Sequence, residues 1–296
     1  MNSRTLAILA CLAATTIYGI NHTIAKGVMP HYIQPFGFIL VRIVGAAILF
    51  WCVSIFLPRE KIEKRDYGRL LICALLGMGI NMLSFFKALE LSTPINSAVL
   101  ITIVPIIVVA LSAMFLKERI TQIKGSGVVM GLIGALVLIL LGAELRQDAP
   151  NIPLGNFFHL INAISYAGYL ILVRRLLQKY HFVTVLKWLF TIGIVIVFPL
   201  SINQFLEVEW STLPTSVYGV VVFVIVGTTF CTYLFNAYGL TKLKASTVSA
   251  FIYVQPLIGV LFAMAMGKDS LTPIKIIGSV LILIGLYLAT KKARIN

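Results

Sequence analysis

Long apolar blocks alternate with short polar breaks along the whole chain. A helix of about 20 residues crosses the roughly 30 Å core of a bilayer, and about ten blocks reach that length. Charged residues, or Pro, Gly and Asn, mark their ends. We therefore predict transmembrane helices near residues 5–25, 34–57, 69–89, 95–116, 125–142, 154–177, 183–203, 216–240, 246–266 and 273–290.

The composition also indicates an all-α integral membrane protein. Hydrophobic residues make up 59% and charged residues 11% of the 296 residues, and the mean hydropathy is +1.00. Soluble domains are about 45–50% apolar and about 25% charged. The formal net charge of +14 comes from basic residues in short loops between apolar runs. A nucleic-acid surface needs them clustered on one solvated face, so we expect the lipid bilayer, and no nucleic acid, as a partner.

The distribution of basic residues predicts the orientation. If the N-terminus is inside and the spans alternate, most Lys and Arg fall in inside segments. The outside segments then hold only Lys26, Lys87, Arg146, Lys268 and Lys275. Because cytoplasmic loops are enriched in Lys and Arg, we predict a multi-pass protein of the cell (inner) membrane with both termini in the cytoplasm.

The sequence lacks the motifs of several enzyme and metal-binding activities. The sequence has no G-x-x-x-x-G-K-[ST] phosphate loop, no H-E-x-x-H and no metal-ligand spacing, so we expect no cofactor and no metal. We find no nucleophile–base pair within a span and predict no catalytic residues. The four cysteines all fall inside predicted spans, where we interpret them as small packing residues.

The two halves of the chain carry the same pattern. The segment "VPIIVVALSAMFLKERITQIKGSG" aligns without a gap on "QPLIGVLFAMAMGKDSLTPIKIIG". A constant offset of 151 positions pairs Pro105 with Pro256 and Glu118 with Asp269. We predict two repeats, residues 1–145 and 146–296. Each holds about five spans, an odd number, so the second is inverted in the membrane, as in alternating-access transporters.

This repeat unit resembles the EamA domain, as does the stretch "IYGINHTIAK" in the first predicted helix. The resemblance implies membership of the drug/metabolite transporter superfamily, with ten helices in two inverted five-helix repeats and export of amino acids and other small metabolites. Two positions depart from the family pattern: Asp269, in "GKDSLT", and His22, where an apolar or small residue is common.

Polar and aromatic residues recur at helical spacing on several spans, which places them on shared helix faces. Polar side chains are costly in hydrocarbon and normally face a cavity or another helix. The alternative for Asn and Ser is hydrogen bonding between helices, at about 0.6 kcal/mol each. We expect a substrate cavity formed by Tyr18, Asn21, His22, Asn81, Phe85, His159, Asn162, Tyr166, Tyr169, Tyr233, Asn236, Ser249, Tyr253 and Gln255.

Charged and titratable residues in the spans raise narrower hypotheses. His22 titrates near neutral pH when unperturbed, so it either takes part in proton coupling or stays neutral in a hydrogen bond. Arg42, within the second span, has no neutral form. We favour a structural pairing of Arg42 with Glu90, and the alternatives are that Arg42 reaches the outer surface or contacts a substrate carboxylate. No Asp or Glu lies in the middle of a predicted span, which leaves exchange or uniport open.

Pro105 and Pro256 lie at matching places in the two repeats. Proline removes an intrahelical hydrogen bond and bends a helix, so this pair indicates either gating hinges or static kinks. The whole pattern predicts a secondary transporter for small organic metabolites, such as amino acids or related zwitterions, that exports by alternating access as a monomer. The alternatives are an intramembrane enzyme and a channel-like facilitator that use the same polar cavity.

Overall fold

The computed structural model describes residues 2–25, 28–29, 31–92, 100–141, 150–265 and 272–291. Its first half contains helices α1 (Ser3–Ala25), α2 (Pro35–Ile55), η1 (Lys64–Asp66), α3 (Tyr67–Ala74), η2 (Leu75–Ile80), α4 (Asn81–Leu91), α6 (Val104–Phe115), α7 (Gln122–Leu136) and η3 (Val137–Leu141). Its second half contains α8 (Ile152–Leu177), α9 (Phe182–Leu206), η4 (Trp210–Thr212), α10 (Thr215–Phe223), η5 (Val224–Cys231), α11 (Thr232–Lys242), α12 (Ala245–Ala250), η6 (Phe251–Tyr253), α13 (Val254–Ala265) and α14 (Pro273–Thr290).

The predicted all-helical membrane fold is confirmed. Over the described ranges, nine helical stretches are long and apolar enough to cross a membrane, and α6 is a shorter apolar helix. The third stretch, Lys64–Leu91, extends beyond the predicted 69–89 at both ends. The predicted fourth span begins at residue 95, and residues 93–99 lie outside the described part.

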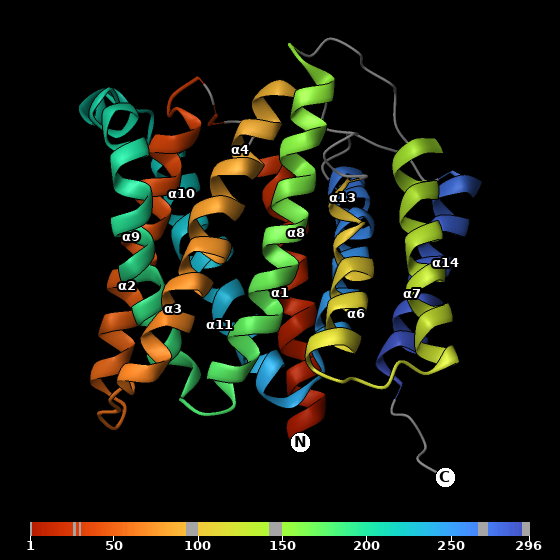
Figure 1. The fold of residues 1–296 in the computed structure, drawn as a ribbon. Coiled ribbons are helices and arrows are strands. Elements are labelled where there is room, and N and C mark those ends of the chain that lie inside the picture. The colour runs from red at the N-terminus through yellow and green to blue at the C-terminus, as the bar shows by residue number, and fades with distance from the viewer. Residues whose placement is uncertain are drawn as a thin grey trace.

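The start of α1 and the end of α14 lie at the same end of the bundle (Figure 1). The guanidinium of Arg4 donates a hydrogen bond from Nη2 to the carbonyl oxygen of Thr290 at 2.5 Å. This contact joins the start of α1 to the end of α14. The location of both termini on one side of the membrane stays a prediction. That this side is the cytoplasm stays a prediction from loop charge.

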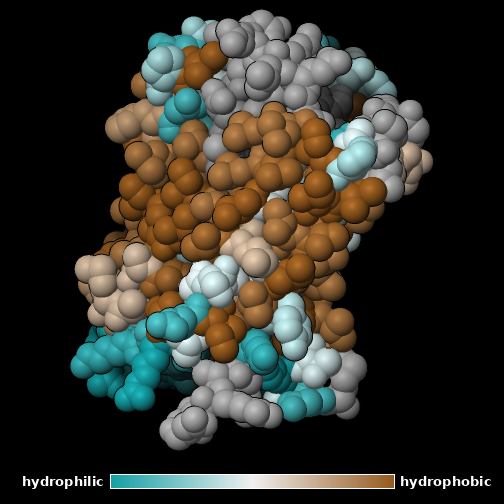
Figure 2. Space-filling view, turned by 90° about the vertical axis from the view of Figure 1, so that its right-hand side faces the viewer, coloured by the Kyte–Doolittle hydropathy of each residue, from teal (hydrophilic) through white to brown (hydrophobic). Residues whose placement is uncertain are grey.

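The outer surface of the bundle is strongly apolar. Figure 2 shows a broad hydrophobic band over the middle of the molecule and hydrophilic residues below it. On α14, for example, Ile277, Leu283 and Tyr287 are 56%, 53% and 63% exposed. Large apolar side chains can be exposed on this surface because the hydrocarbon core of the bilayer, and not water, surrounds the middle of the bundle.

Glycines bring α7 and α14 into close backbone contact. A Cβ atom added to Gly285 would lie 2.5 Å from the amide nitrogen of Gly131, and one added to Gly127 would lie 2.6 Å from that of Ala289. Small residues at helix interfaces in membranes allow this approach. The fifth and tenth spans therefore pack against each other through their glycines.

Several helices are irregular at matching places in the two halves. The third span contains the π-helical segment η2 and the eighth contains the π-helical segment η5. The chain also leaves α-helical geometry just before each predicted hinge: a turn at residues 102–103 precedes Pro105, and the 3₁₀ segment η6 precedes Pro256. Residues within each break or at most two positions from it line the central cavity.

Candidate functional site

A cavity of about 470 Å³ lies among α1, α2, α4, α6, α8, α11, α12, η6 and α13, so both halves of the chain form its wall. Its polar lining residues are Thr15, Tyr18, Asn21, Arg42, Asn81, Glu90, Asn162, Tyr166, Tyr233, Asn236, Ser249 and Gln255. Its apolar lining residues are Met29, Pro35, Phe38, Met82, Phe85, Phe86, Leu89, Ile101, Val104, Leu170, Val248 and Ile252. Pro35 begins α2 and Glu90 lies next to the last residue of α4, and these two helix ends lie opposite the start of α1 (Figure 1). The cavity therefore extends toward the end of the bundle away from the start of α1.

Most residues that the sequence suggested for a cavity do line this one. They are Tyr18, Asn21, Asn81, Phe85, Asn162, Tyr166, Tyr233, Asn236, Ser249 and Gln255. Their role in substrate binding stays a prediction.

Asn81 and Asn162 also join two helices. The Asn162 Nδ2 group donates to the Asn81 carbonyl oxygen at 2.8 Å, and Asn81 Nδ2 donates to the Asn162 carbonyl oxygen at 3.4 Å. Ser165 donates to the carbonyl oxygen of Leu76 at 2.7 Å, in the π-helical segment η2. The two functions considered for Asn in the sequence, cavity wall and contact between helices, therefore coincide at this pair.

Arg42 lies in the cavity wall with only 7% of its surface exposed. Its Nε donates to the Thr229 hydroxyl oxygen at 3.0 Å, and its guanidinium carbon lies 5.7 Å from the centre of the Phe86 ring. The Thr229 hydroxyl in turn donates to the carbonyl oxygen of Val224, five residues earlier in η5. The π-helical segment thus fixes the acceptor that orients Arg42.

The expected pairing of Arg42 with Glu90 is not found. Glu90 instead pairs with Lys87, whose Nζ lies 2.9 and 3.0 Å from the two carboxylate oxygens. The two residues are three positions apart on α4, where side chains are neighbours on the helix surface, and both are exposed by more than a third. Arg42 is held deeper in the bundle by Thr229, out of reach of that carboxylate.

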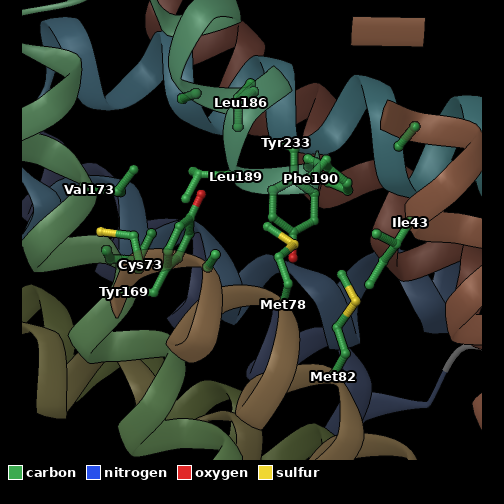
Figure 3. Close-up of a cluster of buried hydrophobic side chains, with 14 of the residues drawn as sticks. Ile43, Cys73, Met78, Met82, Tyr169, Val173, Leu186, Leu189, Phe190 and Tyr233 are labelled. Carbon is green, nitrogen blue, oxygen red and sulfur yellow. The ribbon is translucent and has the colours of Figure 1, made fainter. Parts of the chain in front are cut away.

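Three predicted residues lie outside the cavity wall. His159 is buried and packs edge-on against Phe85, with ring centres 5.9 Å apart. Figure 3 shows Tyr169 in the apolar core beside Cys73, with an exposed fraction of 4%. Tyr253 is 1% exposed and packs against Gly131 of α7.

Helix geometry explains these departures. At about 100° per residue, ten positions separate the directions of His159 and Tyr169 by about 80°, so a stripe of that length turns away from the cavity. Tyr253 lies in the 3₁₀ segment η6. A 3₁₀ turn has 3.0 residues, so the spacing of an α-helix does not hold there. The side chain of His22 and all of Lys26 lie outside the described residues.

A buried charged cluster lies next to the cavity at the end of the bundle that carries the termini. Glu118, whose side chain is 3% exposed, accepts hydrogen bonds from Arg174 Nη1 at 3.0 Å, from the Ala245 amide at 3.1 Å and from the Ser246 hydroxyl. Lys124 Nζ donates to the Ser246 hydroxyl oxygen at 2.5 Å and lies 4.0 Å from the Glu118 carboxylate. We call these five residues the Glu118 cluster.

The Glu118 cluster ties together the turn after α6, the start of α7, the end of α8 and the start of α12. Lys117, just before the glutamate, has a left-handed backbone with φ of 51°. Val248 and Ser249, two and three residues after Ser246 on α12, line the cavity. The sequence shows Glu118 only as a charge shared by the two repeats, and its burial could not be read from spacing.

A membrane-embedded bundle of helices with a polar and aromatic cavity between its two halves has the architecture of a transporter. The comparisons with known proteins give the family. A model of the EamA-like transporter family matches residues 5–140 and again residues 153–291, so the chain belongs to that family and is a membrane transporter.

Named relatives cover most of the chain. It is 25% identical to the uncharacterized transporter YyaM of Bacillus subtilis (strain 168), over 84% of this chain and 82% of that protein. It is 25% identical to an uncharacterized transporter of Archaeoglobus fulgidus, over 94% and 96% of the two chains. It is 24% identical to the uncharacterized inner membrane transporter YicL of Salmonella typhimurium, over 99% and 98%. A solved structure titled "Crystal structure of protein" shares the fold, with a TM-score of 0.78, 19% identity and 96% of each chain covered.

Proposed function

We propose that this protein is a secondary transporter that moves small organic metabolites, such as amino acids or related zwitterions, through the central cavity by alternating access. The observation that carries this proposal is the cavity itself. Its volume of about 470 Å³ falls within the range of about 300–1,000 Å³ typical of small-molecule sites. Its wall combines neutral polar groups with aromatic rings from both halves.

Two inverted repeats would supply the two arrangements that alternating access requires. The offset of 151 positions in the sequence and the two matches of the family model support a duplication. The helices that begin the two halves, α1 and α8, run in opposite directions (Figure 1). We therefore propose repeats at residues 1–145 and 146–296, inverted relative to each other.

The arrangement of charges supports a state closed on one side. The cavity reaches toward the end with Glu90, while the Glu118 cluster joins the helices at the opposite end. We propose that this cluster closes the terminus-bearing side, which loop charge predicts to be cytoplasmic. The helix breaks before Pro105 and Pro256 would provide the hinges.

Counterflow in proteoliposomes tests the proposal. Purified protein is reconstituted with one unlabelled amino acid inside, and uptake of its labelled form is measured over a panel of amino acids, with and without a pH gradient. We expect saturable exchange for at least one amino acid, because a carrier that releases labelled substrate inside can bind unlabelled substrate there and carry it back out. A channel gives no counterflow overshoot. A response to the pH gradient that His22→Phe removes would indicate proton coupling through that residue.

A further inference from the structure

The cavity contains a cation, Arg42, that has no anionic partner among the residues that the structure describes. Arg42 is 93% buried, counted from its exposed fraction of 7%, and lines the cavity. Within the described residues its one side-chain hydrogen bond runs from Nε to Thr229, and no carboxylate lies within 4.0 Å of its guanidinium. The two terminal nitrogens, Nη1 and Nη2, thus keep their donors for another acceptor.

This arrangement orients the guanidinium. The Thr229 hydroxyl holds Nε, and the Phe86 ring lies 5.7 Å from the guanidinium carbon. Fixing Nε in this way leaves the edge formed by the terminal nitrogens as the free face of the group. A planar guanidinium whose terminal nitrogens are free matches the two oxygens of a carboxylate.

No other charge in the described cavity wall competes for the same role. Glu90 is the one acid there, and Lys87 already pairs with both of its oxygens. The remaining polar lining is neutral. It includes Asn21, whose Oδ1 is buried and has no hydrogen-bond partner within the described part of the chain. The cavity therefore presents one buried positive charge amid neutral donors, acceptors and aromatic rings.

We propose that Arg42 anchors the substrate by its carboxylate, through paired hydrogen bonds from Nη1 and Nη2. This inference rests on the proposed transport function and narrows its substrate class to small carboxylates, amino acids among them. A single guanidinium balances one negative charge, which favours a carboxylate over a phosphate dianion. The aromatic lining, with Phe85 and Tyr166, receives the rest of the molecule.

Matched ligands test the anchor on the full-length protein. Phenylalanine and leucine are each compared with their carboxamide, their decarboxylated amine and their deaminated acid. An alkylphosphonate of similar size completes the set. Two readouts are taken: the shift in thermal midpoint of purified protein, and inhibition of amino-acid counterflow. The variants are Arg42→Gln, Arg42→Lys and a control, Arg65→Gln, which removes a positive charge from a side chain that is 76% exposed.

We expect wild-type protein to bind members with a carboxylate at least about tenfold more tightly than the amide and the amine, as for loss of a charge-assisted pair. Arg42→Gln abolishes that preference, and Arg42→Lys keeps part of it as a point charge. Arg65→Gln behaves as wild type. Normal elution of Arg42→Gln on size exclusion, with a cooperative thermal transition, shows that the loss is not misfolding.

The outcomes separate this inference from the transport proposal. Counterflow that is inhibited equally by acids, amides and amines overturns the anchor and leaves the transporter intact. The anchor is equally overturned by an unchanged preference in Arg42→Gln, or by tighter binding of the phosphonate. Absence of counterflow for any compound contradicts the transport proposal. In that case the thermal shifts alone decide on the anchor, and no shift with any acid rejects it.

Discussion

Removing the charge of Glu118 is expected to open the terminus-bearing end of the cavity. The substitution Glu118→Gln keeps the shape of the side chain and one acceptor oxygen, but leaves Arg174 and Lys124 without their anion. Their side chains are 17% and 9% exposed, against 3% for Glu118, so water compensates little. Hydrogen bonds to charged groups contribute about 1.5–3 kcal/mol each, and breaking a buried pair costs about 3–5 kcal/mol. We therefore expect Glu118→Gln to weaken the interactions of the Glu118 cluster by about 3 kcal/mol.

That energy bears on the balance between two folded states if the cluster forms only in the closed one. A ligand or mutation shifts such a balance by its differential effect on the two states. A loss of about 3 kcal/mol corresponds to a shift of about a hundredfold in the ratio of closed to open. The fold itself is expected to persist, because the apolar core joining α2, α3, α4, α8 and α9 is untouched.

Cysteine accessibility measures this shift. All four native cysteines are replaced by alanine, and Val248→Cys places a thiol in the cavity wall two residues from Ser246. An impermeant maleimide is added from the terminus-bearing side of oriented vesicles. We expect slow labelling with Glu118 intact and labelling at least tenfold faster with Glu118→Gln. Equal labelling rates would refute the role of the cluster in closure. A large loss of thermal stability without faster labelling would assign the cluster to folding alone.

The control is Glu63→Gln, on the same side of the bundle. The hydrogen bond from Lys179 lowers the pKa of Glu63, so this substitution also removes a real negative charge. Glu63 is 48% exposed, and exposed ion pairs contribute little. We expect its labelling rate to match that of the protein with both glutamates.

Three further predictions concern packing and the cavity. Gly285→Val should lower the thermal midpoint strongly, because a Cβ atom at this position would lie 2.5 Å from the Gly131 amide nitrogen. The control Gly259→Ala should change the midpoint little, because a Cβ atom there would have no neighbour within 4 Å. Equal midpoints for the two variants would contradict the close contact of α7 and α14. Tyr253→Phe should keep stability, because the buried hydroxyl has no hydrogen-bond partner among the described residues. Tyr253→Ala should cost about 3–5 kcal/mol of unfolding free energy. A stability loss in Tyr253→Phe would show that the hydroxyl is bonded. Tyr166→Ala should weaken counterflow without changing the thermal midpoint, because Tyr166 lines the cavity. Tyr169→Ala should mainly lower the thermal midpoint, because Tyr169 packs in the core and against Gly77. The reverse pattern would mean that Tyr169, and not Tyr166, lines the cavity.

Hydropathy is enough to predict the spans, because each must supply about twenty apolar residues whatever its neighbours do. It is also enough to place Asn21, Asn81 and Tyr166 away from lipid, since polar groups are costly there. Spacing fails where the helix changes its geometry. Tyr253 lies in a 3₁₀ turn, and the partner of Arg42 lies in a π-helical segment of another span. No pattern along the chain links Arg42 to Thr229, 187 residues away.

The irregular segments and the cavity belong together for a physical reason. In lipid, a backbone group released from a regular helix finds no water, so such breaks persist only where protein or a cavity satisfies the group. In η5, Thr229 bonds the Val224 carbonyl oxygen and also accepts from Arg42. In η2, the Leu76 carbonyl oxygen accepts from Ser165. The hydrogen bonds that hold the distorted helices are thus made by residues of the cavity or next to it, so a substrate that displaces one of them acts directly on the elements that would have to move.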